Sequence, residues 1–184
     1  MVFLFFDTNV IQNLHSFGEF IFDNYLPKEK FMMIKQKYGS EMFLELDALR
    51  QIVFVLQRGS LPVAISVKSL REFLKIYNRV KRNHLVNWNL KLLEWWEINK
   101  KYVKVPDVNQ LRKARRLVNS GRIDFLTDSE DKLLVAEALV LGCNTFLTFD
   151  RKTVLCHKKK LARFGIDVLN PREFVNKYRL EMSG

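Results

Sequence analysis

Short apolar runs alternate with longer amphipathic stretches along the chain. Four runs are almost wholly apolar: 2–6, 61–66, 145–149 and 166–169. Short runs with no polar face are typical of strands buried on both sides of a parallel sheet. The stretches between them carry apolar residues at helical spacing. The pattern therefore predicts an α/β fold, with helices flanking the sheet.

The helical stretches have recognisable ends. Residues 10–58 are predicted to be mostly helical, with a break at Gly39 and Ser40. A later helix, capped by Thr127 or Asp128, is expected to stop at Gly142. A last helix opens near Pro171. The tryptophans in 83–99 form an apolar stripe, which is more typical of a core than of a surface for stacking bases.

Composition is that of an ordinary globular protein. The chain has 184 residues, 48% of them hydrophobic, and is interpreted as one domain spanning 1–184. Its two cysteines, Cys143 and Cys156, fit neither a disulfide framework nor a zinc site, which favours the cytoplasm. No secretory signal and no membrane-length run is recognised, so no membrane partner is expected.

Charge is distributed unevenly. The net charge is +11, which favours a polyanionic partner. Residues 123–150 hold one Lys against six acids, whereas 101–122 hold seven Lys or Arg against one acid and 151–184 hold nine against three. Carboxylates beside cations suggest a site for metal ions and a phosphate backbone. A solvated acidic helix start between two basic helices would give the same counts.

Taken singly, the acids at strand ends have structural explanations. Asp7 can cap the helix that follows it, and Ser69 with Glu72 fits a capping box. Asp128 and Asp131 can stabilise a helix dipole. Together with Asp150, however, these acids are predicted to reach the same carboxyl edge of the sheet, where open α/β sheets bind ligands. Carboxylates gathered there repel one another, and Mg²⁺ or Mn²⁺ is the usual reason to tolerate this.

In this order, the motifs resemble those of PIN-domain nucleases. The resemblance is carried by Phe-Phe-Asp-Thr-Asn at 5–9, the Ser-led helix from 66 to 74, Asp-Lys-Leu-Leu-Val-Ala-Glu-Ala-Leu at 131–139 and Leu-Thr-Phe-Asp-Arg at 147–151. It implies a Rossmann-like parallel sheet flanked by helices. The match is poor at about 15–60 and 80–120, where this chain would carry enlarged helical regions.

The resemblance also implies a site and an activity. The metal-binding acids would be Asp7, Glu72, Asp131 and Asp150, with Thr148 and Asn9 in support and Asp128 as the alternative to Asp131. One or two Mg²⁺ or Mn²⁺ ions would activate a water that attacks RNA and leaves a 5′ phosphate. The basic residues that would hold the RNA backbone are Arg112, Lys113, Arg115, Arg116, Lys158, Lys159 and Lys160, with Arg163 beside them.

Other interpretations remain open from the sequence. The same fold could serve as a catalytically inert module that binds RNA or protein, its acids acting only as caps. A haloacid-dehalogenase-like phosphatase also begins with a strand ending in Asp, but it requires Asp-x-Asp, and here the third residue is Asn9. Many small members of the PIN family are toxins, so an antitoxin partner and a homodimer are further expectations from the resemblance.

Overall fold

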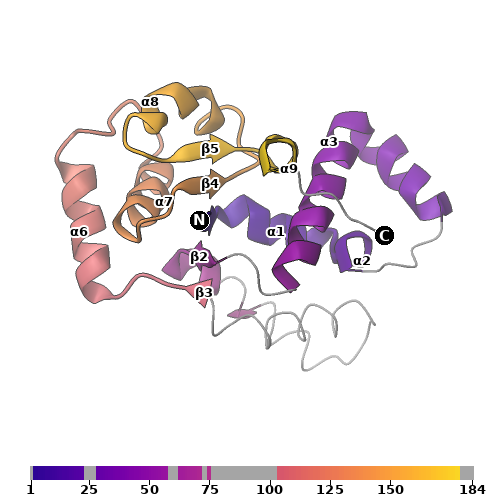
Figure 1. Ribbon diagram of the computed structural model, residues 1–184, viewed down its shortest axis with the longest axis horizontal. Helices are drawn as coiled ribbons and strands as arrows, with labels where there is room; N and C mark the ends of the chain where they lie inside the picture. Colours follow the sequence, from indigo (N-terminus) through magenta and orange to yellow (C-terminus); the bar gives the residue numbers. More distant parts are fainter. Residues whose placement is uncertain (1, 23–27, 58–61, 72–73, 76–102, 179–184) are drawn as a thin grey trace.

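A parallel sheet lies at the centre of the molecule (Figure 1). The computed structural model describes residues 2–22, 28–57, 62–71, 74–75 and 103–178. In this part of the chain the sheet has five strands in the order β3-β2-β1-β4-β5, and every neighbouring pair is parallel. The strands are β1 (Leu4–Phe6), β2 (Val63–Ile65), β3 (Val103–Lys104), β4 (Thr145–Leu147) and β5 (Asp167–Leu169). The predicted α/β fold is confirmed.

The central strand β1 is buried on both faces. Leu4 and Phe6 belong to one core cluster, whereas Phe5 belongs to the other, where its ring stacks on Phe146 at 5.3 Å between centroids. Successive side chains of a strand point to opposite faces. Because both faces of this strand meet helices, it carries no polar position, which explains the uniformly apolar run in the sequence.

One face of the sheet is covered by the N-terminal helices and the last helix. These are α1 (Thr8–Ser16), α2 (Gly18–Phe22), α3 (Lys28–Gln57) and α9 (Pro171–Tyr178). The helix α3 is broken at Gly39, whose φ of 84° and ψ of 161° are not helical. The predicted break at Gly39 and the predicted start of the last helix at Pro171 are both confirmed.

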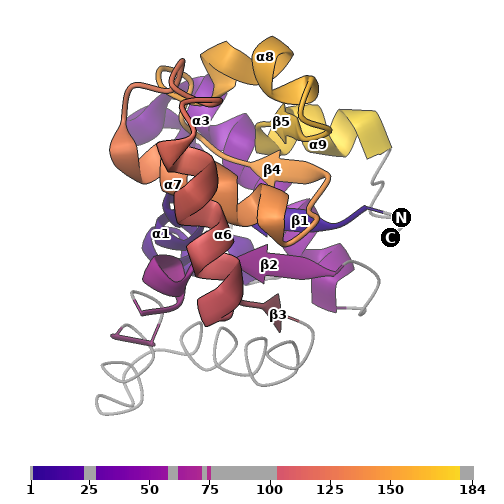
Figure 2. The same cartoon turned by 90° about the vertical axis from the view of Figure 1, so that its left-hand side faces the viewer.

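The other face is covered by α7 (Ser129–Val140), the 3₁₀ turn η1 (Leu155–His157) and α8 (Lys158–Ala162). Outside α7 lies α6 (Val108–Asn119), which Figure 2 shows in front of it. A small cluster of Ala114, Ile123 and Ala136 joins these two helices. Seen from the sheet, α6 is therefore an outer layer.

Several details differ from the sequence-based expectations. The edge strand β3 was not predicted, because its two residues are too few and too exposed to form an apolar run. The strand β4 ends at Leu147, so Asp150 lies on the loop three residues later rather than directly at the strand end. The tryptophan stripe in 83–99 falls outside the described residues. Among the described helices, none is long and apolar enough to cross a membrane.

Candidate functional site

The candidate site lies where the direction of the sheet connections reverses. From β1 the chain proceeds outward to β2 and β3, and it then returns to the other side of β1 to form β4 and β5. In open α/β sheets, ligands bind in the crevice outside the carboxyl ends of the two strands at such a point. Here those ends carry Asp7 after β1 and Thr148 to Asp150 after β4.

Asp7 is buried and firmly held. The residue is only 3% exposed, and its backbone N–H donates to the Leu147 carbonyl at 3.1 Å. Its Oδ1 accepts from the Thr8 backbone N–H at 2.6 Å. Its Oδ2 accepts from the Asn9 amide at 2.6 Å and from the Thr148 hydroxyl at 2.5 Å. Asp7 is the N-cap of α1, as its structural explanation required. Its burial and its contact with β4 go beyond what an N-cap needs.

Asn9 and Thr148 connect the ends of β1 and β4. The Asn9 amide group donates to Asp7 and also to the Thr148 hydroxyl at 2.9 Å, while its Oδ1 accepts from the Phe149 N–H at 3.0 Å. The Thr148 hydroxyl donates to Asp7 and accepts from Asn9 and from the Asp150 N–H at 2.9 Å. These bonds use the one donor and two acceptor positions of the hydroxyl. Both side chains are therefore fixed in one orientation.

Asp150 organises the loop after β4. Its Oδ1 accepts from the backbone N–H groups of Lys152 and Thr153, both at 2.8 Å, and its Oδ2 accepts from the Thr153 hydroxyl at 2.7 Å. Sequence reasoning missed Thr153. The signal was available in the spacing Asp150-x-x-Thr153, since Asp side chains commonly bond backbone and hydroxyl groups two or three residues ahead.

The start of α7 brings two further acids to this edge. Asp128 is the N-cap of α7, and its Oδ1 accepts from the N–H groups of Glu130 at 2.8 Å and Asp131 at 3.1 Å. Asp131 lies in the first turn. The cap role explains Asp128 without a metal, whereas no such backbone contact accounts for the Asp131 carboxylate among the described residues.

The end of β2 is tied to the same edge. A helix begins at Val67, and Ser66 is its cap, because the Ser66 hydroxyl accepts from the Ser69 N–H at 2.8 Å. The capping box that the sequence suggested, with Ser69 as the N-cap, is therefore wrong: the N-cap is Ser66, three residues earlier. The Ser69 hydroxyl instead bonds that of Thr8 at 2.9 Å, and Lys68 forms an ion pair with Glu130 at the start of α7. Glu72 itself lies outside the described residues.

Electrostatics show that three of the acids influence one another. Burial raises the pKa of Asp7 to about 6; hydrogen bonds from Thr148 and Thr8 oppose the rise, and the charges of Asp131 and Asp150 add to it. The pKa of Asp131 is also raised, mainly by burial and further by the charges of Asp128, Asp150 and Glu130. A hydrogen bond from Thr153 opposes the rise. Burial acts in the same direction on Asp150, but hydrogen bonds from Thr153 and Lys152 leave the pKa of Asp150 lowered overall.

The acids thus share one edge without forming a closed ligand cage. In the part of the chain that the structure describes, no group of three or more His, Cys, Asp or Glu is arranged to hold a metal ion. The structure brings Asp7, Asn9 and Thr148 into direct contact and places Asp131 and Asp150 within electrostatic reach of Asp7. The donor set is entirely of carboxylate oxygens, the ligand type that Mg²⁺ and Mn²⁺ prefer.

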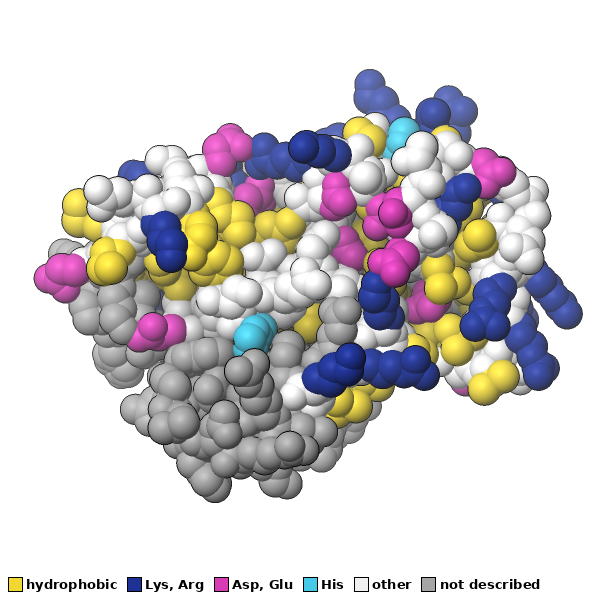
Figure 3. Space-filling view, turned by 180° about the vertical axis from the view of Figure 1, so that it is seen from behind, with side chains coloured by type: hydrophobic (Ala, Val, Ile, Leu, Met, Phe, Trp, Pro, Cys, Tyr) yellow, Lys and Arg dark blue, Asp and Glu magenta, His cyan; other side chains and the backbone are white. Residues whose placement is uncertain are grey.

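Cations lie around this edge. In the view from behind, acidic side chains gather near the middle of the surface, with Lys and Arg side chains around them (Figure 3). The predicted basic residues of α6, Arg112, Lys113, Arg115 and Arg116, are all exposed. On α8, Lys158 pairs with Glu173 at 2.7 Å and Lys160 lies over the Phe125 ring. These two lysines therefore have partners within the protein.

Comparisons with other proteins give little. No protein-family model matches the sequence, and no curated protein matches it. Among solved structures, the chain is similar to VapBC2 from Rickettsia felis bound to a DNA fragment from their promoter, with 14% identity and a TM-score of 0.45 over 92% of this chain and 98% of that chain. A likeness this distant supports no conclusion about function.

Proposed function

We propose that this protein is a metal-dependent ribonuclease whose site is the carboxyl edge between β1 and β4. The observation that carries the proposal is the buried, hydrogen-bonded Asp7 at this point of the sheet: burial raises the pKa of Asp7, and the charges of Asp131 and Asp150 add to the rise. A protein rarely gathers carboxylates in a buried place unless a cation offsets their repulsion.

In this proposal Asp7, Asp131 and Asp150 bind Mg²⁺ or Mn²⁺ together with Glu72. When bound, the ion would supply a water of lowered pKa and would offset the charge on the scissile phosphate. Thr148 and Asn9 position the Asp7 carboxylate, since both donate to the same oxygen. Thr153 does the same for Asp150.

Two observations bear on the choice of ligands. Asp128 already serves as the cap of α7, which favours Asp131 as the third acid. The cap of the helix from 67 is Ser66, so the capping-box explanation for Glu72 loses its partner residue. Both observations favour the proposed ligand set of Asp7, Glu72, Asp131 and Asp150.

The proposed substrate is RNA, held by the basic faces of α6 and α8. The exposed cations of α6, from Arg112 to Arg116, and Lys159 of α8 suit contacts to phosphates. Lys158 and Lys160 would exchange their contacts with Glu173 and Phe125 for contacts with phosphates. An antitoxin partner, a homodimer and a place in the cytoplasm remain predictions from the family resemblance.

Replacement of Asp7 by Asn tests the proposal. Asn is as good an N-cap as Asp, so α1 should keep its start while the site loses a negative ligand. The amide nitrogen replaces the oxygen that accepts from Asn9 and Thr148, which is why folding of the variant is measured as well. We expect the wild type to cleave RNA in Mn²⁺ or Mg²⁺ and Asp7→Asn to lose at least about a hundredfold in rate. The assay follows a labelled RNA with and without EDTA, and thermal unfolding checks that the variant is folded.

A matched pair of variants tests the choice of the third ligand. Asp131→Asn should lose cleavage as Asp7→Asn does, whereas Asp128→Asn should keep it, because Asn replaces Asp at an N-cap with little change in stability.

Full activity in Asp7→Asn would contradict the ribonuclease proposal. A folded wild type that binds no Mn²⁺ by calorimetry would favour the inert binding module.

A further inference from the structure

A cavity of about 300 Å³ lies beside the candidate site, between α1, α3 and the loop after β4. Six of its lining residues matter here: Asn13, Tyr38, Glu41, Glu45, Phe149 and Arg151. We propose that this cavity binds one unstacked base of single-stranded RNA, with guanine preferred. The inference rests on the proposed function, and it adds to that function a specificity site that the catalytic acids do not provide.

The cavity shares its wall with the site. Phe149 and Arg151 flank Asp150 in the sequence. The Phe149 N–H donates to Asn9, and the Asn13 amide donates to the Asn9 carbonyl at 2.8 Å. A nucleotide whose phosphate lies at the carboxylates would therefore have a neighbouring base at the mouth of this cavity.

The charge of the lining favours a base over a phosphate. It includes two carboxylates, Glu41 and Glu45, against the single guanidinium of Arg151. A phosphate would meet an excess of negative charge here, and the exposed cations of α6 offer it a better place. A neutral base meets no such repulsion.

The lining also presents flat surfaces for stacking. The Arg151 guanidinium donates to Glu41 at 2.7 Å and to Glu45 at 3.1 Å, so two carboxylates hold its plane in place. Tyr38 and Phe149 add aromatic rings. The Tyr38 ring also meets the Phe17 ring edge-on at 5.0 Å and lies under the Lys37 ammonium at 5.1 Å, so a base would take the place of the ammonium. Unstacked RNA bases are commonly bound between aromatic rings and arginine planes, with their edges read by hydrogen bonds.

The preference for guanine follows from the acceptors. Guanine presents two adjacent N–H donors, at N1 and N2, on its Watson–Crick edge, whereas the other three bases place an acceptor next to their donor there. A carboxylate accepts two parallel bonds. Each oxygen of Glu45 already accepts one bond, from Arg151 and from the Arg172 N–H. Glu41 bonds Arg151 through Oε2 and its side chain is 72% exposed, so Glu41 is the residue that would read the base.

Binding without metal tests this separately from cleavage. Fluorescently labelled uridine pentamers with G, A, C or U at the centre are titrated with the full chain in EDTA, and anisotropy gives each Kd. We expect the G pentamer to bind about tenfold more tightly than the others. Glu41→Gln should remove most of this ratio. Tyr38→Leu should weaken all four pentamers by a similar factor, because stacking does not depend on the base.

Glu29→Gln is the matched control, since Glu29 is an exposed acid of α3 that does not line the cavity. It should keep the wild-type ratio. Equal affinity for the four pentamers, no binding of any, or an unchanged ratio in Glu41→Gln would each overturn the inference. A guanine preference in a protein that cleaves no RNA in Mn²⁺ would support base binding by the cavity and refute the ribonuclease proposal. Cleavage by the wild type that is lost in Asp7→Asn, without any base preference, would support the ribonuclease proposal and refute base binding by the cavity.

Discussion

At the scale of single residues, Thr148 has the most demanding position. Its hydroxyl makes three hydrogen bonds in a place that solvent does not reach, to Asp7, Asn9 and the Asp150 N–H. A carboxylate, an amide and a backbone group all depend on it. Thr148 therefore determines how Asp7 is presented, although it would bind neither metal nor substrate.

Thr148→Val should be both less stable and less active than the wild type. Valine has nearly the same shape, but it leaves one N–H of the Asn9 amide and the Asp150 N–H without their acceptor, while the other N–H of the Asn9 amide keeps Asp7. We expect a loss of about 1–3 kcal/mol in the free energy of unfolding, measured by urea denaturation. Cleavage should fall more than stability alone explains, because Asp7 loses a positioning bond. Thr127→Val, at an exposed threonine, should change neither; equal effects of the two variants would refute the role of Thr148.

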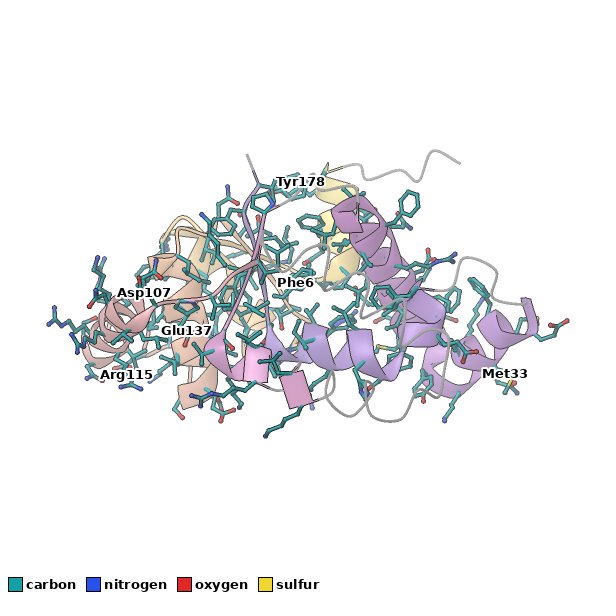
Figure 4. The ribbon with its side chains drawn as sticks, turned by 90° about the horizontal axis from the view of Figure 1, so that it is seen from below. Phe6, Met33, Asp107, Arg115, Glu137 and Tyr178 are labelled. Carbon is teal, nitrogen blue, oxygen red and sulfur yellow. The ribbon has the colours of Figure 1, made fainter. Side chains whose placement is uncertain are left out.

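Among the described residues three acids are buried, Asp7, Glu45 and Glu137, and neither the proposed chemistry nor the proposed cavity uses Glu137. It is 3% exposed, and within the described part of the chain its Oε2 has no hydrogen-bond partner. Burial raises the pKa of Glu137 to about 7, and the charge of Arg115 opposes the rise. Figure 4 shows Arg115 on the outer helix α6 and Glu137 deeper, on α7.

The pKa of Glu137 predicts how stability changes with pH. Its folded pKa of about 7 lies above the ordinary value of 4.5, so the folded state holds this proton more tightly than the unfolded chain does. Glu137 should therefore lower the free energy of unfolding as pH rises from about 4.5 to about 7. Glu137→Met should remove this loss. The free energy of unfolding of the variant minus that of the wild type should therefore be about 2 kcal/mol larger at pH 8 than at pH 5. Urea denaturation of both proteins at pH 5 and at pH 8 measures this difference. The same difference between variant and wild type at both pH values would contradict the prediction.

The sequence indicated the residues at strand ends but not how they bond. Asp7, Asn9 and Thr148 were predicted from motifs, and the structure places them in contact. Thr153 and the Arg151–Glu41–Glu45 group were missed. Glu41 and Arg151 are 110 positions apart, so only the folded chain brings them together.

At the scale of elements, α3 depends on one glycine. Gly39 has φ 84° and ψ 161°, a backbone region that is essentially restricted to glycine. Space is not the constraint, since a Cβ at Gly39 would meet nothing within 4 Å in the described structure. The break lets the two halves of α3 run in different directions.

Gly39→Ala should therefore destabilise the protein through the backbone alone. We expect about 1–3 kcal/mol less free energy of unfolding, measured by urea denaturation. Ser40→Ala, at the neighbouring exposed position, should be close to neutral. If both variants are equally stable, alanine is not strained at position 39 and the backbone conformation of Gly39 does not require glycine.

The elements themselves were largely predictable, for a physical reason. The strands β1, β2 and β4 are apolar because they are buried on both faces, whereas the edge strand β5 is partly exposed and begins with Asp167. Several helices have a readable boundary, such as Gly39, Asp128 or Pro171. The cap at Ser66 was misplaced because Ser66 and Ser69 both precede helical residues, and sequence alone does not show where the strand β2 ends. The edge strand β3 is too short to produce a pattern.

At the scale of the whole molecule, a group of acids lies at one edge of a strongly basic chain. The net charge is +11, and Asp7, Asp131 and Asp150 lie near one another at the carboxyl edge of the sheet, while exposed cations lie on α6. Such an arrangement would hold the RNA backbone at a distance from the acids and direct one phosphate toward them. It also means that affinity for RNA should depend strongly on salt.

Two pairs of variants test whether α6 contacts phosphates. Arg112 and Arg116 are exposed and four residues apart, so they share a face of α6; Arg115 is left unchanged because it acts on Glu137. Replacing both by Gln should lower the slope of log K against log salt for single-stranded RNA by about 1.4, or about 0.7 for each phosphate that the protein no longer neutralises. Lys35→Gln with Lys104→Gln removes the same net charge from exposed positions outside α6 and outside the proposed cavity, and should leave the slope unchanged. Affinities measured in EDTA over a range of KCl concentrations give both slopes. Similar slopes for the two pairs would mean that net charge, rather than the face of α6, attracts the RNA.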